Sequence, residues 1–177
     1  MALKATICKV ELNIADMDRG YYADHVLTLA QHPSENDERL MLRLLAFVLY
    51  AHEDLAFSKG LSDPDEPDIW QKDLTGTIDL WIDLGQPDEK RVMKSCGRSR
   101  QVAVVAYGNA VPIWWAAIAP KLERANNLEA RRLVVQGDTP LAVFVQKNMK
   151  LQCTVQDGQL WLSDNERSIE IDAIPLR

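Results

Sequence analysis

The sequence predicts a mixed α/β fold in which a central β-sheet carries helices on both faces. Apolar and polar residues alternate near both ends of the chain, which is typical of half-buried strands. A long apolar segment follows helical spacing, and a continuous apolar run at residues 102–107 is typical of a central strand. The order hairpin, helix, hairpin, helix, buried strand, helix favours one mixed sheet with flanking helices.

The N-terminal region predicts a β-hairpin followed by a long helix. Residues 6–12 alternate in polarity, residues 16–20 are turn-like, and residues 21–29 form a second strand with one apolar face. The pair Ser34 and Asp37 resembles a capping box. Apolar residues then recur at helical spacing on several faces, so we expect a buried helix that runs to about Glu53.

Residues 68–84 predict a second hairpin with a turn at residues 74–77. A two-residue or a four-residue loop gives the same register, with three opposed pairs: Lys72 and Asp79, Trp70 and Trp81, Asp68 and Asp83. The first two pairs are favourable across strands. Two facing carboxylates repel, so one of them must take up a proton or share a cation. The apolar residues alternate with these pairs, so we expect the Asp/Trp/Lys face to point outward or into a cleft.

The later elements follow from turn and capping residues. Pro87 at an N1-like position and Gly97 beyond the end bracket a short helix, and Pro112 opens a third helix. Residues 133–135 predict a short strand, and Thr139 with Pro140 predicts a further helix through Val145. The C-terminal segment predicts strands at residues 151–155, 160–162 and 169–174, that is, a C-terminal β-hairpin region. We expect a single domain over residues 1–177.

Composition limits the class of function. The net charge is −6, so no global positive field attracts nucleic acid, which counts against a large sequence-reading DNA binder. Cys8, Cys96 and Cys153 lack the spacing of a metal site or a disulfide framework. The sequence shows no secretory signal and no membrane-spanning apolar run. We therefore expect a cytoplasmic protein without a membrane partner, as a monomer or weak oligomer.

Acidic and basic residues near the second hairpin are the candidate functional groups. Mg²⁺ sites are commonly built from one or two carboxylates and water, which makes the Asp68/Asp83 pair a candidate. Glu53 is a third candidate, because a helix C-terminus disfavours an anion; the alternative is a solvated helix end. The basic cluster is Lys90, Arg91, Lys94, Arg98 and Arg100, of which Lys90, Lys94 and Arg98 recur every four residues. It could orient phosphates or form a solvated helix face.

These residues resemble a known pattern. A helix with a late Glu, then Pro67-Asp68, then an acidic residue on the next strand is similar to the PD-(D/E)XK nuclease superfamily. The chain resembles the YaeQ family of bacterial proteins more closely, over nearly its whole length. The similar phrases are Glu66-Pro67-Asp68-Ile69-Trp70, Leu80-Trp81-Ile82-Asp83-Leu84-Gly85-Gln86-Pro87, Lys94-Ser95-Cys96-Gly97-Arg98, Ala106-Tyr107-Gly108 and Asn148-Met149-Lys150-Leu151-Gln152-Cys153.

The resemblance implies a restriction-endonuclease-like fold, a mixed central sheet flanked by helices, here with additional N-terminal and C-terminal β-hairpins. It also implies that Glu53, Asp68 and Asp83 hold Mg²⁺ or Mn²⁺, whose bound water attacks a phosphodiester. Gly85 stands where the superfamily places a lysine. Lys94 could supply that charge from the next helix, and Gln86 could position substrate or water.

Three hypotheses follow. The first is a metal-dependent nuclease or phosphodiesterase that acts on nucleic acid. The second is a non-catalytic protein of the same fold that binds nucleic acid or a transcription partner, which Gly85 and the acidic net charge favour. The third is purely structural: Asp68 and Asp83 are each satisfied by separate groups, for example Arg98 or backbone N–H donors.

Overall fold

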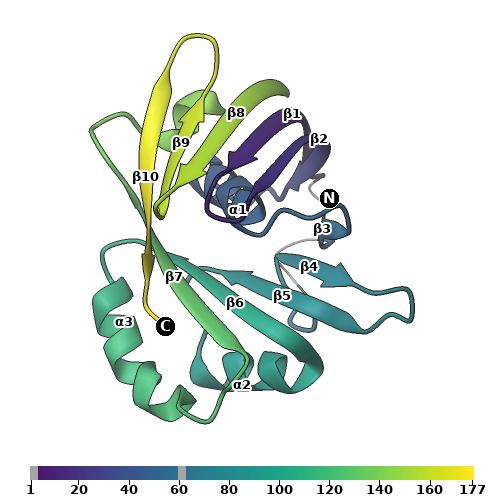
Figure 1. The fold of residues 1–177 in the computed structure, drawn as a ribbon, viewed down its shortest axis with the longest axis vertical. Helices are drawn as coiled ribbons and strands as arrows, with labels where there is room; N and C mark the ends of the chain where they lie inside the picture. The colour runs from purple at the N-terminus through teal and green to yellow at the C-terminus, as the bar shows by residue number, and fades with distance from the viewer. Residues whose placement is uncertain (1–3, 60–62) are drawn as a thin grey trace. The chain divides into compact units, whose positions relative to one another are not determined.

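In the computed structural model, residues 4–59 and 63–177 are described, and they form a mixed α/β fold (Figure 1). They contain ten strands, three α-helices and two short 3₁₀ helices. Internal contacts divide the chain into two compact units. Unit 1 comprises Met1–Ala51, Lys59–Ser62 and Val135–Ala173, and unit 2 comprises His52–Ser58, Asp63–Val134 and Ile174–Arg177. The single domain over residues 1–177 stays a prediction.

Unit 1 contains strands in the order β2-β1-β8-β9-β10. Their bounds are Thr6–Asp16 (β1), Tyr21–Gln31 (β2), Asn148–Gln156 (β8), Gln159–Ser163 (β9) and Ser168–Pro175 (β10). β1 and β2 form an antiparallel hairpin, and β8, β9 and β10 form an antiparallel meander. β1 and β8 are parallel, which joins the two ends of the chain. The predicted N-terminal and C-terminal hairpins are therefore confirmed.

The helix of unit 1, α1 (Asp37–Leu49), begins later than predicted. Its N-cap is Asn36, whose side chain accepts a hydrogen bond from the Arg39 N–H at 2.8 Å. The predicted cap, Ser34, instead hydrogen-bonds the His32 ring at 2.6 Å. All of the residues from Leu40 to Leu49 are buried, as expected for a helix with apolar residues on several faces.

α1 also ends earlier than predicted, at Leu49 rather than near Glu53. The last turn is tighter than an α-helical turn, because the N–H of Tyr50 donates a hydrogen bond to the carbonyl of Phe47, only three residues earlier. The guanidinium of Arg19 then donates to the carbonyls of Leu49 and Ala51. These donors satisfy the helix end, so Glu53 lies in the turn that follows, and its side chain is exposed. The predicted helix at residues 140–145 is a 3₁₀ turn, Leu141–Phe144.

Unit 2 contains strands in the order β7-β6-β5-β4-β3. Their bounds are Leu55–Phe57 (β3), Ile69–Lys72 (β4), Ile78–Leu84 (β5), Ser99–Tyr107 (β6) and Leu128–Val135 (β7). β3, β4 and β5 are antiparallel, whereas β5, β6 and β7 are parallel. β7 is longer than the short strand predicted at residues 133–135. The helices of unit 2 are α2 (Glu89–Arg98), α3 (Val111–Ile118) and the 3₁₀ turn Ala119–Leu122.

The boundaries of α2 also differ from the prediction. Asp88 is the N-cap and accepts from the N–H of Arg91 at 2.8 Å, so Pro87 precedes the helix instead of opening it. Gly97 lies inside the last turn rather than beyond it. Pro112 occupies the first turn of α3, as predicted.

The β4–β5 hairpin keeps part of the predicted register. Trp70 pairs with Trp81, as predicted. A bulge places Lys72 opposite Ile78, so the predicted pairing of Lys72 with Asp79 is wrong. Lys72 lies over the Trp70 ring, 3.6 Å from its centroid, and Asp79 forms an ion pair of 2.9 Å with Arg100.

The prediction that the Asp/Trp/Lys face points outward or into a cleft fails on β5 at two residues. Trp81 and Asp83 are both buried. Trp81 belongs to a core cluster with Val92 of α2 and Val102 of β6, and α3 contributes partly buried side chains to it. In Figure 1, α2 and α3 lie along β5, β6 and β7. At Trp81, the helices of unit 2 therefore cover the face of β5 that the alternation of polarity assigned to solvent or a cleft.

In the two stretches of chain that the structure describes, no helix has the length and apolar character of a membrane span.

Candidate functional site

The predicted carboxylate pair lies at the end of β5 in unit 2. The paired stretch of β4 begins at Ile69, so Asp68 precedes it by one residue. The N–H of Asp68 donates to the Ile82 carbonyl at 3.1 Å. Its Oδ2 accepts from the N–H of Leu84 at 2.8 Å. Asp68 thus binds the backbone on either side of Asp83. Burial raises the pKa of the Asp83 carboxyl, and the charge of Asp68 adds a smaller contribution in the same direction.

Asp83 is bound by the guanidinium of Arg91. Arg91 Nε donates to Asp83 Oδ2 and Nη2 donates to Oδ1, both at 3.0 Å, which is the bidentate geometry that arginine forms with carboxylates. The Asp83 side chain is 3% exposed and the Arg91 side chain 31% exposed. Burial is the largest cause that raises the pKa of Asp83, and the hydrogen bond from Arg91 opposes it. The same bond raises the pKa of Arg91, with further contributions from the charges of Asp83 and Asp68.

Arg91 also fixes the segment before β4. Its Nη1 donates to the Pro64 carbonyl at 3.0 Å, and its Nη2 donates to the Glu66 carbonyl at 2.9 Å. One guanidinium therefore connects the end of β5 with the segment that leads to Asp68. The facing carboxylates predicted a proton or a shared cation, and Arg91 is the cation that the structure places beside them.

Two other basic residues of α2, Lys94 and Arg98, are exposed and pair with Asp65 at the surface. Lys94 Nζ binds Asp65 Oδ1 at 3.0 Å, and Arg98 Nη1 lies 3.8 Å from the same oxygen. The hydrogen bond from Lys94 is the largest cause that lowers the pKa of Asp65. The residues that face the 63–68 segment are thus Arg91, Lys94 and Arg98, so Arg91 takes the place of Lys90 in the predicted row.

Lys94 and Gln86, the two other predicted catalytic residues, make their hydrogen bonds elsewhere. Lys94 binds Asp65, as described above. Gln86 follows β5, and its Nε2 donates to the carbonyl of Tyr107, the last residue of β6, at 3.2 Å. Gly85 between Asp83 and Gln86 has a φ of 108°, a conformation that a lysine would adopt only with strain.

A divalent cation does not fit this arrangement of the predicted ligands. Both oxygens of Asp83 accept from Arg91, Asp68 Oδ2 accepts from the backbone, and Glu53 is exposed in a turn. Within residues 4–59 and 63–177, no group of three or more His, Cys, Asp or Glu side chains is arranged to hold a metal ion. The structure therefore brings Asp68 and Asp83 together but does not join Glu53 to them as a metal centre.

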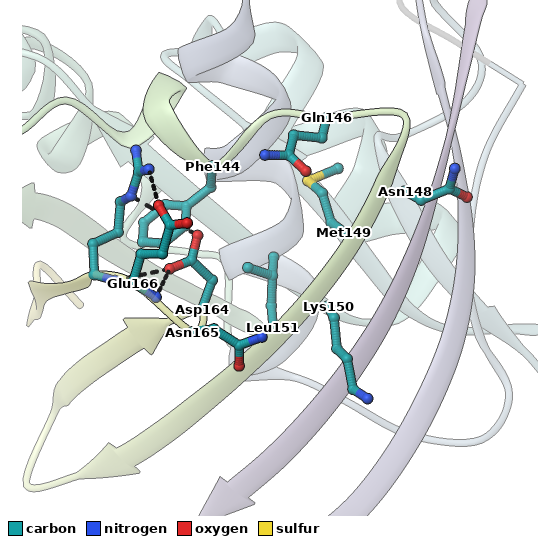
Figure 2. Close-up of a pocket in the computed structure, with 10 residues that line it drawn as sticks. Phe144, Gln146, Asn148, Met149, Lys150, Leu151, Asp164, Asn165 and Glu166 are labelled. Carbon is teal, nitrogen blue, oxygen red and sulfur yellow. Dashed lines mark hydrogen bonds and ion pairs between the residues drawn. The ribbon is translucent and has the colours of Figure 1, made fainter.

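Unit 1 contains a second candidate site, an open pocket of about 220 Å³ between the start of β8 and the β9–β10 connection (Figure 2). Three of its charged residues, Asp164, Glu166 and Arg167, bind one another. Asp164 accepts from the N–H groups of Glu166 and Arg167, both at 2.8 Å, and these bonds lower its pKa. Arg167 donates to Glu166 at 3.2 Å and to the Val143 carbonyl at 3.3 Å. This network explains the shape of the connection, and the pocket shows no pairing of a nucleophile with a base.

Sequence reasoning included Arg91 in the basic cluster but gave it no role of its own. Arg91 follows Asp83 by eight residues across a turn and a helix start, and no local pattern links the two. The helix face is a usable signal: counted from Arg91, the residues Arg91, Lys94 and Arg98 lie at i, i+3 and i+7, which places them on one side of α2.

The fold and the site define a mixed α/β protein in which one arginine binds a buried carboxylate, and a second carboxylate lies beside it. The chain belongs to the YaeQ family: the family's sequence model, described as YaeQ protein, matches residues 1–173. A relative from Salmonella typhi, described as "Uncharacterized protein YaeQ", is 48% identical over 172 residues, which covers 97% of this chain and 95% of the relative. A relative with the same description from Escherichia coli (strain K12) is 45% identical over 173 residues, 97% of this chain and 96% of the relative.

Solved structures agree with this assignment. The crystal structure of the YaeQ protein from Xanthomonas axonopodis pv. citri matches with a TM-score of 0.93 at 49% identity and covers 98% of both chains. The YaeQ protein from Pseudomonas syringae matches with a TM-score of 0.88 at 32% identity, over 98% of this chain and 96% of that one.

Proposed function

We propose that this protein binds nucleic acid through α2 and that the Asp68/Asp83 pair has a structural role instead of a catalytic one. The observation that carries the proposal is the division of the basic side chains of α2. Arg91 is directed at the buried Asp83 and is fully engaged there. Lys90, Lys94 and Arg98 remain on the exposed surface of the same helix.

The relationship of the fold to the PD-(D/E)XK nucleases is part of this proposal. The hairpin β4–β5, the helix α2 and the parallel strand β6 follow one another in the order that the resemblance implies. Pro67-Asp68 precedes β4, and Asp83 lies in β5. We infer a protein of this fold class in which the acidic positions stabilise the strand ends.

The surface ion pairs of α2 leave its bases accessible to phosphate. Asp65, Lys94 and Arg98 are all exposed, and exposed ion pairs contribute only about 0–1 kcal/mol each. A phosphate can replace Asp65 as the partner at little energetic cost. Because the whole chain is acidic, we expect weak binding that depends strongly on ionic strength.

A metal-dependent nuclease is the second candidate, and the proximity of Asp68 and Asp83 favours it. For Mg²⁺ or Mn²⁺ to bind there, Arg91 would have to release both oxygens of Asp83 and its two backbone carbonyls. The arrangement described above supports the binding protein over the nuclease.

Fluorescence anisotropy with labelled single-stranded and double-stranded DNA and RNA tests the proposed binding. We expect log Kd to rise linearly with log salt, and the double substitution Lys94→Glu/Arg98→Glu to weaken binding and flatten that slope. The matched control is Lys9→Glu/Lys150→Glu, which reverses two exposed charges in unit 1. Equal losses in both double variants would contradict binding through α2.

Incubation of the same oligonucleotides with Mg²⁺ or Mn²⁺ separates the two candidates. The proposal predicts binding without cleavage. Cleavage by the unaltered protein that disappears in Asp83→Asn would instead establish the nuclease.

A further inference from the structure

The strand β2 forms one edge of the sheet in unit 1. Its eleven residues pair with β1 over their full length, from Tyr21 opposite Asp16 to Gln31 opposite Thr6, with no interruption of the register. Within the described ranges β1 is the only strand that pairs with β2. The backbone groups on its other side therefore form a long, regular edge of the kind that pairs readily with another strand.

β2 lacks the features that usually protect an edge strand. Such strands are commonly short, carry lysine or proline, or contain a bulge. β2 has no lysine, no proline and no bulge. Its one acidic side chain, Asp24, accepts a hydrogen bond of 2.7 Å from Asn13 Nδ2 on β1, so this charge is held toward the neighbouring strand of the same chain.

We infer that two copies of this chain form a symmetric dimer by antiparallel pairing of their β2 strands about a twofold axis at Val26. Val26 is the midpoint of Tyr21–Gln31, so this register uses the whole strand of each copy. Antiparallel pairing of eleven residues forms about ten backbone hydrogen bonds, which matches the number found in typical protein interfaces.

The side chains on the outer face are complementary in this register. Val26, which is 81% exposed, lies against Val26 of the second copy. Asp24 lies opposite Thr28, and Tyr22 lies opposite Ala30, so no like charges face each other. A register centred on Asp24 would oppose two aspartates, and one centred on Thr28 would leave the first residues of each strand unpaired.

The inner face extends the core of unit 1. On this face Tyr21, Ala23, His25 and Leu27 are half-buried, and Leu29 is buried. The His25 ring contacts Phe47 of α1, with ring centroids 5.2 Å apart. In the proposed dimer, His25 lies opposite Leu27 and Ala23 lies opposite Leu29 of the second copy. Pairing would therefore bury apolar side chains that a single copy leaves partly exposed.

Engineered cysteines test the register. Across the twofold axis the Cα atoms of Val26 would be about 4.5–5.5 Å apart, within the range that a disulfide spans. Val26→Cys in a Cys96→Ser background should therefore form a covalent dimer on mild oxidation, and the native Cys8 and Cys153 are buried. Thr28→Cys in the same background is the control, because its two copies would lie about 13 Å apart along the strands. Equal or absent cross-linking at the two positions would overturn the proposed register.

Sedimentation equilibrium tests the dimer itself. Val26→Lys places two like charges on the axis and should raise the dimer dissociation constant about tenfold. Ile113→Lys on α3, at a residue that is 78% exposed, should leave it unchanged. A wild-type protein that sediments as a monomer up to its highest soluble concentration would overturn the dimer, as would equal effects of the two lysine variants.

Discussion

Glu35 in unit 1 and Asp83 in unit 2 are both almost completely buried, with side chains that are 1% and 3% exposed. Glu35 has two arginine partners. Its Oε1 binds Arg43 Nη2 at 2.9 Å, and its Oε2 binds Arg39 Nη1 at 2.8 Å. Asp83 has one arginine partner, because both of its oxygens bind Arg91. The same problem, a carboxylate removed from water, is solved with two cations in one unit and with one in the other.

The difference shows how much each site depends on a single residue. Arg39 and Arg43 follow Glu35 by four and eight residues along α1, so the helix itself supplies both. Arg91 must serve Asp83, the nearby charge of Asp68 and the carbonyls of Pro64 and Glu66 together. The comparison also shows that a buried carboxylate in this chain is neutralised by arginine, which weakens burial as a sign of a metal site.

The largest expected effect is that of Arg91→Ala. The substitution leaves Asp83 buried without its cation and removes the donors to Pro64 and Glu66. We expect the free energy of unfolding to fall by about 3–5 kcal/mol, measured by urea denaturation. Arg98→Ala, which removes an exposed partner of Asp65, is the control and should change it by less than about 1 kcal/mol. Similar losses in both variants would mean that Arg91 is not the essential partner.

A smaller effect is expected for Arg39→Ala in unit 1. Arg43 remains bound to the other oxygen of Glu35, so the buried charge keeps a partner. We expect a loss of about 1.5–3 kcal/mol, the contribution of one hydrogen bond to a charged group, measured under the same conditions. If the free energy of unfolding fell as much as in Arg91→Ala, a second arginine partner would not protect a buried carboxylate in the way we expect.

The pH dependence of Arg91→Ala sharpens the comparison further. Burial raises the pKa of Asp83, and without Arg91 nothing of similar strength opposes the shift. The folded variant would then hold a proton on Asp83 more tightly than the unfolded chain, whose pKa is about 3.9. Its stability therefore rises as the pH falls through the folded-state pKa. We expect its deficit relative to the unaltered protein to shrink between pH 8 and pH 4, and a constant deficit would contradict this.

The smallest expected effect is that of Lys94→Ala. Lys94 and Asp65 are both exposed, so the loss should lie within about 0.5 kcal/mol. Chemical denaturation measures this change. A loss above that range would show that the surface of α2 contributes to stability in the way that Arg91 does.

The sequence predicts most of the fold, because apolar periodicity identifies strands such as β1 and β6 and the buried helix α1. It fails where side chains distant in sequence decide the outcome. Arg19 satisfies the carbonyls at the end of α1, so the helix stops before Glu53. The helices of unit 2 cover Trp81, so alternation along β5 does not identify its solvent face.

For the site, the sequence predicts that Asp68 and Asp83 meet and that one of them takes up a proton or shares a cation. It does not identify the cation, because the pairing of Asp83 with Arg91 depends on where the N-cap at Asp88 starts α2 and on which face of that helix meets β5. The predicted Mg²⁺ or Mn²⁺ and the predicted roles of Glu53, Lys94 and Gln86 stay predictions.

Manganese binding tests the central claim, that Arg91 and not a metal ion neutralises the carboxylate pair. We would titrate Mn²⁺ into the unaltered protein and into Asp83→Asn and follow the electron paramagnetic resonance signal of the free ion. We expect the same weak, non-stoichiometric loss of signal in both proteins. Stoichiometric binding by the unaltered protein that disappears in Asp83→Asn would contradict it.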